Sequence, residues 1–149
     1  MRYRSIALTI LCMLAGTSPA RALELVDFQG ICFFPEQPSH RSDAETPSQD
    51  WLVDPLTLKE AISVLKQYPD LRVSLVGNAD RNECSGVECQ ALSKRRADTV
   101  ATWLLTGGVA ALRIEHISGV GTSDPKDFEK TETQRSHNRC VYVMPNYGD

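Results

Sequence analysis

The sequence has no excess of positive charge, no catalytic spacing of side chains and no long apolar run beyond its first residues. Its 16 Lys and Arg residues stand against 19 Asp and Glu residues, which argues against nucleic acid as the main partner, because phosphate binding needs a basic face. Without a second apolar run of membrane length, the mature chain is expected to have no transmembrane segment. No triad and no paired carboxylates occur, and His40, His116 and His137 fit solvated or structural roles, so we expect no enzyme activity.

The first 22 residues have the three parts of a secretory signal peptide. "MRYR" is basic, "SIALTILCMLAG" is an apolar run of 12 residues, and Ala20 and Ala22 fit an A-x-A cleavage site. We expect cleavage after Ala22, with an uncleaved anchor as the alternative. Three basic residues leave with this segment: Arg2, Arg4 and Arg21. The remaining 13 basic residues face 19 acidic ones, so the mature chain carries a net charge of −6.

Four cysteines follow the signal peptide: Cys32, Cys84, Cys89 and Cys140. An even number in an exported chain favours two disulfides. Cys84 and Cys89 flank the turn-like sequence "SGVE", so we expect them to pair locally, which leaves Cys32 with Cys140. A zinc site is the alternative, but structural zinc sites usually contain C-x(2–4)-C pairs, and only one such pair is present. We therefore expect no metal.

The apolar patterns after residue 22 predict one domain over residues 23–149 with the order β-α-β-α-β-β. Strands are expected at 23–34, 71–77, 112–121 and 139–144, and helices at 54–68 and 90–105. Asp54 and Pro55 fit the N-cap and first position of the first helix. Helices separated by strands indicate an α/β two-layer sandwich with the helices on one face of a single sheet. The long polar loop at 35–51 is of the kind that often borders a site.

Asp80 directly follows the second expected strand, at the strand end where α/β folds place ligands. Lys94, Arg95 and Arg96 stand near the expected start of the second helix, where cations oppose the helix dipole. Helical spacing puts Arg96 at the edge of the apolar stripe and the other two toward solvent. Asp80 and Arg96 then form either a salt bridge or the two walls of a pocket for a zwitterion, with an ammonium on the acid and a carboxylate on the guanidinium. The simpler alternative is that Asp80 only caps the turn after its strand.

Five motifs follow one another roughly over Asp54–Met144: "GNADR", "ALSKRRADTV", "GGVAALRI", "GVGTSDP" and "SHNRCVYVM". Together and in this order they resemble the OmpA-like peptidoglycan-binding domain family (OmpA C-terminal, Pal and MotB type). The resemblance implies a non-catalytic periplasmic module that uses no cofactor. It implies binding to the cell wall, with association with the outer membrane as a further option. It also implies that Asp80 and Arg96 hold the zwitterionic end of diaminopimelate in the stem peptide of peptidoglycan. Four secondary contacts are implied: Ala79, Leu92, Asn138 and Arg139.

The family also implies a mixed sheet in which the first and last strands are neighbours, which supports pairing of Cys32 with Cys140. The sequence departs from the family pattern at four positions: Asn78, Ala79, Cys89 and Cys140. The alternative function is a protein–protein assembly module of the cell envelope, with weak or lost wall binding. In that case the loop at 35–51 is where specificity for an envelope protein partner would reside.

Overall fold

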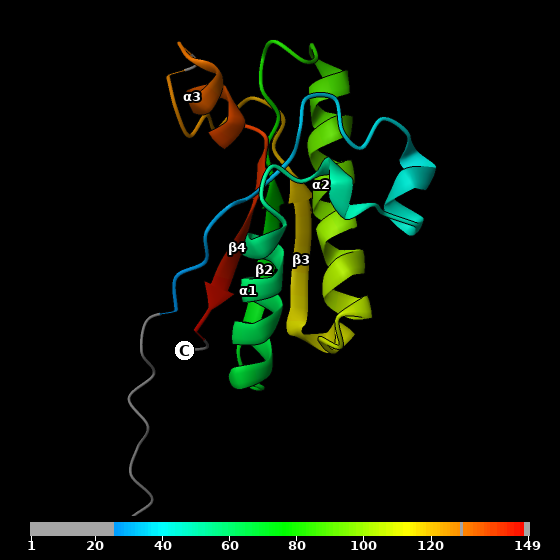
Figure 1. Ribbon diagram of the computed structural model, residues 1–149, viewed down its shortest axis with the longest axis vertical. Coiled ribbons are helices and arrows are strands. Elements are labelled where there is room, and N and C mark those ends of the chain that lie inside the picture. Colours follow the sequence, from blue (N-terminus) through cyan, green and yellow to red (C-terminus); the bar gives the residue numbers. More distant parts are fainter. Residues whose placement is uncertain (1–25, 129, 148–149) are drawn as a thin grey trace, which may run out of the picture.

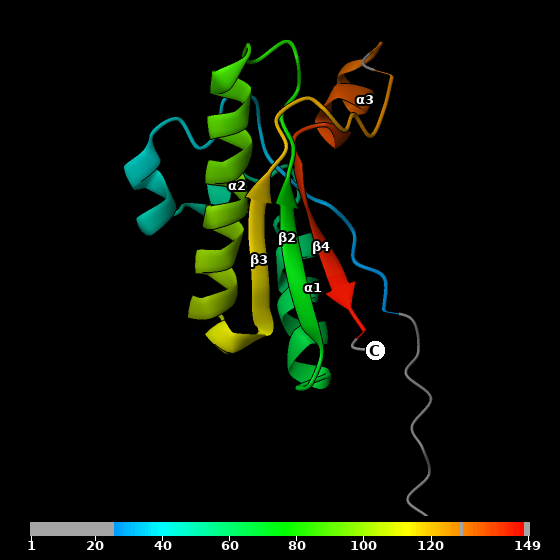
Figure 2. The same ribbon diagram turned by 180° about the vertical axis from the view of Figure 1, so that it is seen from behind.

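A four-stranded sheet with helices packed on one face forms the body of the computed structural model, which describes residues 26–128 and 130–147 (Figures 1 and 2). The signal peptide expected at residues 1–22 lies outside the described residues. The strands are β1 (Ile31–Cys32), β2 (Arg72–Gly77), β3 (Ile114–Gly119) and β4 (Cys140–Asn146). Their order in the sheet is β1-β4-β2-β3. β4 runs antiparallel to both of its neighbours, and β2 and β3 are parallel, so the mixed two-layer fold is confirmed.

The helices described are α1 (Pro55–Gln67), α2 (Val87–Thr106) and the short α3 (Glu132–His137). Three 3₁₀ turns accompany them: η1 (Arg41–Glu45), η2 (Gln49–Trp51) and η3 (Ala111–Arg113). Figure 1 shows α1 in front of the strands and α3 at the upper end of the sheet, and the cyan turn η1 lies beside α2. Viewed from behind, the strands lie in front of α1 (Figure 2).

The first helix begins where its sequence predicts. The Asp54 side chain accepts a hydrogen bond from the Leu56 N–H at 2.9 Å, and Pro55 occupies the first helical position, where a missing N–H costs nothing. Leu58, Ala61 and Leu65 recur at a spacing of three to four residues and are buried against the sheet. Burial of each leucine stabilises the fold by about 1.5–3 kcal/mol.

The core lies between the helices and the inner face of β2 and β4. Val73 and Leu75 of β2 are fully buried while Arg72 is exposed, as the period of two requires. The rings of Phe33 and Trp103 stack across the core with centroids 5.9 Å apart. One cluster therefore joins α1, α2, the sheet and the segment after β1.

Two glycines allow α2 to cross the sheet at very short range. A Cβ at Gly77 would lie 2.0 Å from the carbonyl oxygen of Ser93, and one at Gly119 would lie 2.3 Å from the Lys94 nitrogen. No other residue fits at these strand ends without a shift of the backbone. The close approach brings the middle of α2, including Arg96, to the carboxyl end of β2.

The first strand is shorter than its apolar sequence predicts. Of the strand predicted over 23–34, the described residues 26–34 form β1 at Ile31 and Cys32, and residues 23–25 lie outside the described range. Beyond Cys32, the Phe33 N–H still donates to the Arg139 oxygen at 3.0 Å, and the chain then pairs with the returning segment. The Phe34 N–H donates to the Trp51 oxygen at 2.8 Å, and Phe33 forms a single bridge with Leu52.

Two disulfides are present. Cys32 and Cys140 are register partners on β1 and β4, with Cα atoms 3.8 Å apart. Cys84 and Cys89 join the loop after β2 to the first turn of α2, with Cα atoms 5.1 Å apart. Over residues 26–128 and 130–147, no helix is long and apolar enough to cross a membrane.

Candidate ligand-binding site at the end of β2

The chain that leaves β2 stays bonded to the sheet on both sides. The Asn78 N–H donates to the Cys140 oxygen at 3.0 Å, and the Ala79 N–H donates to the Gly121 oxygen at 2.9 Å. Asn78, Ala79 and Asp80 are consequently buried, although they lie beyond the last strand residue. The sheet thus fixes the position of Asp80 rather than leaving it on a free loop.

Asp80 is buried with its two carboxylate oxygens in different situations. Its Oδ1 accepts a hydrogen bond from the Asn82 N–H at 2.9 Å, which is the turn-capping role considered above. Its Oδ2 is buried without a hydrogen-bond partner among the described residues. A buried oxygen of this kind costs about 1–3 kcal/mol when it stays unpaired. The turn-capping hydrogen bond therefore satisfies only one of the two oxygens of the Asp80 carboxylate.

Arg96 is fully buried, and all five N–H groups of its guanidinium have acceptors. Nε donates to the Gln37 oxygen at 2.8 Å, and Nη1 donates to the Asn78 oxygen at 3.1 Å. Nη2 makes a longer contact with the Phe34 oxygen at 3.5 Å. The two remaining donors face the carboxylate of Glu83, with Nη1–Oε1 at 2.6 Å and Nη2–Oε2 at 2.7 Å.

Glu83 is the residue that sequence reasoning missed. Its carboxylate also accepts the Asp80 N–H at 2.8 Å and the Glu36 N–H at 2.9 Å, and its side chain is only 3% exposed. We name the donors that surround it, which are the Arg96 guanidinium and the N–H groups of Asp80 and Glu36, the carboxylate niche. Within the described part of the chain, the ion pair of Arg96 is with Glu83, and none joins Arg96 to Asp80.

The electrostatics of the niche favour the charged pair. Burial alone would raise the pKa of Glu83, but the hydrogen bonds and charge of Arg96, with the N–H groups of Glu36 and Asp80, outweigh it. The pKa of Glu83 consequently lies below its ordinary value of 4.5. Burial lowers the pKa of Arg96 from its ordinary value, and Glu83 raises it part of the way back.

The helix dipole was the wrong reason to single out the basic cluster. α2 begins at Val87, three residues earlier than expected, so Lys94, Arg95 and Arg96 lie in its third turn. The dipole effect fades within the first turn. Lys94 is exposed and pairs with Asp98, as a solvent-facing residue should. Arg95 instead lies half-buried, with its Nε donating to the Pro38 oxygen at 3.2 Å.

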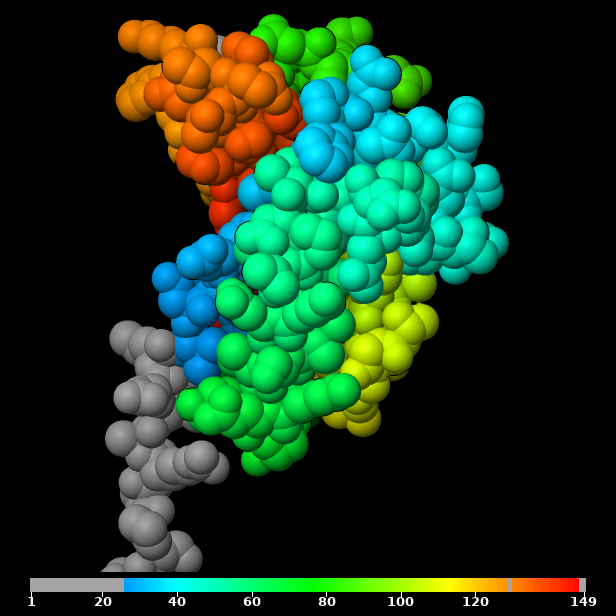
Figure 3. Space-filling view, in the orientation of Figure 1, coloured from blue at the N-terminus to red at the C-terminus, as the bar shows by residue number. Residues whose placement is uncertain are grey.

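The segment after β1 crosses over Arg96 and closes one side of the niche. Phe34 and Gln37 supply carbonyl acceptors to Arg96, and Pro38 supplies one to Arg95. Figure 3 shows this segment, in light blue to cyan, on the surface at the upper end of the molecule. The long loop at 35–51 therefore borders the site.

A surface hollow of about 540 Å³ lies directly outside the niche. It is lined by Glu36, Ser39, Asn82, Glu83, Cys84, Ser85, Glu88, Leu92 and Arg95. We call it the outer pocket. Its described lining includes Glu83 but neither Asp80 nor Arg96, so Glu83 separates the arginine from the hollow.

The implied secondary residues lie at the same end of the sheet but mostly support it. Ala79 and Leu92 pack with Cys89 in a small apolar cluster against Cys84. The Asn138 side-chain oxygen accepts the N–H groups of Lys126 and Asp127, which fixes the loop before α3.

Arg139 extends this support toward β1. Its Nε donates to the Phe33 oxygen at 3.3 Å, and its Nη2 pairs with Glu132. Its charge also contributes to the lowered pKa of Arg96, since the two cations lie in the same region.

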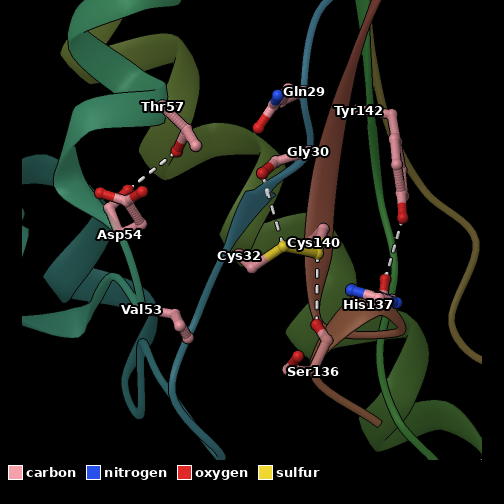
Figure 4. Close-up of a pocket in the computed structure, with 10 residues that line it drawn as sticks. All are labelled: Gln29, Gly30, Cys32, Val53, Asp54, Thr57, Ser136, His137, Cys140 and Tyr142. Carbon is pink, nitrogen blue, oxygen red and sulfur yellow. Dashed lines mark hydrogen bonds between the residues drawn. A yellow bond between two sulfur atoms is a disulfide. The ribbon is translucent and has the colours of Figure 1, made fainter. Parts of the chain in front are cut away.

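A second hollow of about 290 Å³ surrounds the Cys32–Cys140 disulfide (Figure 4). Two of its hydroxyls are engaged locally: that of Thr57 donates to the Asp54 backbone oxygen at 2.8 Å, and that of Tyr142 donates to the His137 backbone oxygen at 3.0 Å. It has no basic fork comparable to Arg96 in its lining. Across the described ranges, no group of three His, Cys, Asp or Glu residues could hold a metal ion.

Fold and site together define a two-layer module whose buried arginine binds a carboxylate at the carboxyl end of β2. The chain belongs to the OmpA family, whose model matches residues 54–139. Domains of this type are non-catalytic binding modules.

Two curated proteins are similar to this chain. The probable lipoprotein YiaD of Escherichia coli strain K12 is 36% identical over 87 residues, covering 58% of this chain and 39% of that protein. The outer-membrane lipoprotein YfiB of Pseudomonas aeruginosa is 38% identical over 73 residues, covering 49% of this chain and 42% of that protein. The chain thus matches about two fifths of the length of each.

Solved structures share the fold. The peptidoglycan-associated lipoprotein of Burkholderia pseudomallei superposes with a TM-score of 0.59 at 19% identity, covering 79% of this chain and 90% of that chain. The C-terminal domain of Helicobacter pylori MotB superposes with a TM-score of 0.63 at 16% identity, covering 81% of this chain and 86% of that chain.

Proposed function

We propose that this chain is a peptidoglycan-binding module whose site takes the zwitterionic end of diaminopimelate in a stem peptide. The observation that carries the proposal is a buried arginine fork that holds a carboxylate at the end of β2. Membership of the OmpA family supports it, as does the fold shared with a peptidoglycan-associated lipoprotein.

Arg96 and Asp80 take complementary parts of such a ligand. The planar guanidinium matches a carboxylate through two parallel hydrogen bonds. Asp80 Oδ2 is buried and has no hydrogen-bond partner in the part of the chain described, and an ammonium offers three donors. A group with both charges therefore satisfies the two residues together. Ala79, Leu92, Asn138 and Arg139 hold the walls around them.

We place the protein in the periplasm at the cell wall. One relative is named as an outer-membrane lipoprotein, which supports a place in the envelope. A polymeric wall offers many copies of the same peptide, so rebinding can hold a module whose single-site affinity is modest.

Pelleting with purified sacculi tests the proposal. We expect Asp80→Asn and Arg96→Lys each to weaken pelleting about ten- to a hundredfold, since each change removes a charge-assisted contact. Free diaminopimelate should compete with the wall. Matched controls are Glu60→Gln and Arg72→Lys, which alter exposed residues on α1 and at the opposite end of β2. Equal pelleting of all four variants would refute the assignment.

One observation favours a second function, that of an envelope assembly module. The five donors of Arg96 are already filled by acceptors within the chain. If neither the wild type nor a variant lacking the Glu83 carboxylate pelleted with sacculi, the assembly function would be preferred, and the loop at 35–51 would be the first place to seek the partner surface.

A further inference from the structure

The carboxylate niche is a complete binding site whose occupant belongs to the same chain. Glu83 receives four hydrogen bonds, two from Arg96 and one each from the backbone of Asp80 and Glu36. One Glu83 oxygen, Oε1, is shared by Asp80 N and Arg96 Nη1, so both functional positions converge on it. Four donors around one carboxylate nearly saturate its acceptor sites.

A second carboxylate cannot bind while Glu83 stays. Every guanidinium donor of Arg96 has an acceptor, and a ligand in the outer pocket meets the Glu83 side chain rather than the arginine. Two carboxylates in the same niche would also repel each other. A ligand carboxylate therefore gains the fork only after Glu83 has left it.

We propose that Glu83 is an internal competitor that keeps the site closed, and that an external carboxylate ligand binds by displacing it into the outer pocket. That the ligand is a wall peptide rests on the proposed function; the closed niche itself does not. Displacement exchanges one carboxylate for another at Arg96, so no buried arginine is left without a partner.

The surroundings of Glu83 allow this exchange. Its neighbours Arg81, Asn82, Ser85 and Gly86 are exposed, so the loop can move without opening the core. Arg95 lies next to Arg96 on α2 and lines the outer pocket. It therefore gives the displaced Glu83 carboxylate a new cationic partner. The Cys84–Cys89 bridge follows Glu83 directly and limits how far it can travel.

The closed state lowers apparent affinity in proportion to its population. If the niche is open about 1% of the time, the apparent dissociation constant rises about a hundredfold over the intrinsic one. Removal of the Glu83 carboxylate should therefore tighten the binding of small carboxylates at least about tenfold. Glu83→Ala vacates the niche, Glu83→Gln keeps the side chain but loses the charge, and Glu60→Ala is the control for net charge.

The experiment uses the folded mature chain with two probes, acetate and free diaminopimelate, against chloride at equal ionic strength. We expect acetate to raise the melting temperature of Glu83→Ala, and to shift the Arg96 side-chain signal in nitrogen-edited NMR. The wild type and Glu60→Ala should show neither effect, and Glu83→Gln should fall between them. If Glu83→Ala folds only with acetate present, the proposal is also supported. A Glu83→Ala protein that ignores acetate, or a wild type that responds equally, overturns it.

Pelleting with sacculi, run in parallel, separates this inference from the proposed function. If Glu83→Ala binds acetate but no variant pellets with sacculi, the proposal that Glu83 is an internal competitor is supported and the proposal of wall binding is refuted. If the wild type pellets, Glu83→Ala pellets no better and acetate has no effect, wall binding is supported and the internal competitor is refuted.

Discussion

The two terminal nitrogens of Arg96 lie 2.6 and 2.7 Å from the two carboxylate oxygens of Glu83, and both side chains are buried. Buried pairs of this geometry are costly to break from one side, because the remaining charge stays desolvated. The pair joins the middle of α2 to the loop after β2, so the arrangement of the site and the stability of the fold depend on the same contact.

A double-mutant cycle should reveal this coupling. We expect Glu83→Ala and Arg96→Ala each to lower the free energy of unfolding by about 3–5 kcal/mol. The double variant should lose clearly less than the sum of the two, since it leaves no unpaired buried charge. Urea denaturation provides the measurement. Additive losses would mean that the two side chains act on stability independently.

Stability should fall with acid in a way that depends on Glu83. The pKa of Glu83 is lowered below 4.5 in the folded chain, so its contribution is fully present above that value and is lost as the pH falls through the folded pKa. Urea unfolding of the wild type and Glu83→Gln should therefore differ by a constant amount above pH 4.5 and converge below it. The other charged residues that act on this pair, donate to it or line the same pocket are Arg95, Arg139, Glu36, Asp80 and Glu88. A difference that widened toward acid would contradict this assignment of the shift.

Gly77→Ala should be among the most damaging of small substitutions. Its Cβ would lie 2.0 Å from the Ser93 backbone oxygen, so α2 must move away from the sheet. We expect a loss of about 3 kcal/mol, and weaker pelleting because Arg96 moves with the helix. Gly86→Ala is the comparison for backbone strain without a clash: its φ of +52° and ψ of −123° are unfavourable for alanine, but no atom lies within 4 Å, so about 1–3 kcal/mol is expected without a shift of α2. Thermal melts of the two variants, compared directly, decide the point.

The two disulfides should contribute unequally. The Cys32–Cys140 bridge spans a sequence separation of 108, for which the chain-entropy model gives about 5 kcal/mol, whereas Cys84–Cys89 spans 5 and gives about 2 kcal/mol. Paired Cys→Ser variants, melted with and without reductant, would measure both. We expect loss of the short bridge to act mainly on the site, by loosening Glu83. Equal effects of the two pairs on the melting temperature would count against the model.

The sequence predicted the architecture well because its signals are local. Asp54 and Pro55 marked the start of α1, and the alternation of Val73 and Leu75 marked β2, each through contacts within a few residues. The ends of the helices and strands were predicted less accurately. Gly86 precedes α2 and has no side chain that could cap it, so the start of α2 is marked less clearly in the sequence than that of α1.

The site was only half predictable. Asp80 and Arg96 could be selected by position and residue type, but their relation could not. Glu83 reaches Arg96 through a tight loop, and Glu36 reaches Glu83 across 47 positions of sequence. Such contacts depend on the path of two irregular segments, for which no periodicity or motif exists in the sequence.

The bond between Cys32 and Cys140 also sets the route by which mechanical load crosses the molecule. These residues are register partners on adjacent strands, separated by 108 positions in sequence. Tension applied to the chain on either side of the bridge passes from β1 to β4 through two sulfur atoms. Both helices of the core, the Glu83–Arg96 pair and the outer pocket lie inside the bypassed segment. Under the proposed binding to the wall, a pull on the two flanks of the bridge does not extend the segment between Cys32 and Cys140, which carries the Glu83–Arg96 pair.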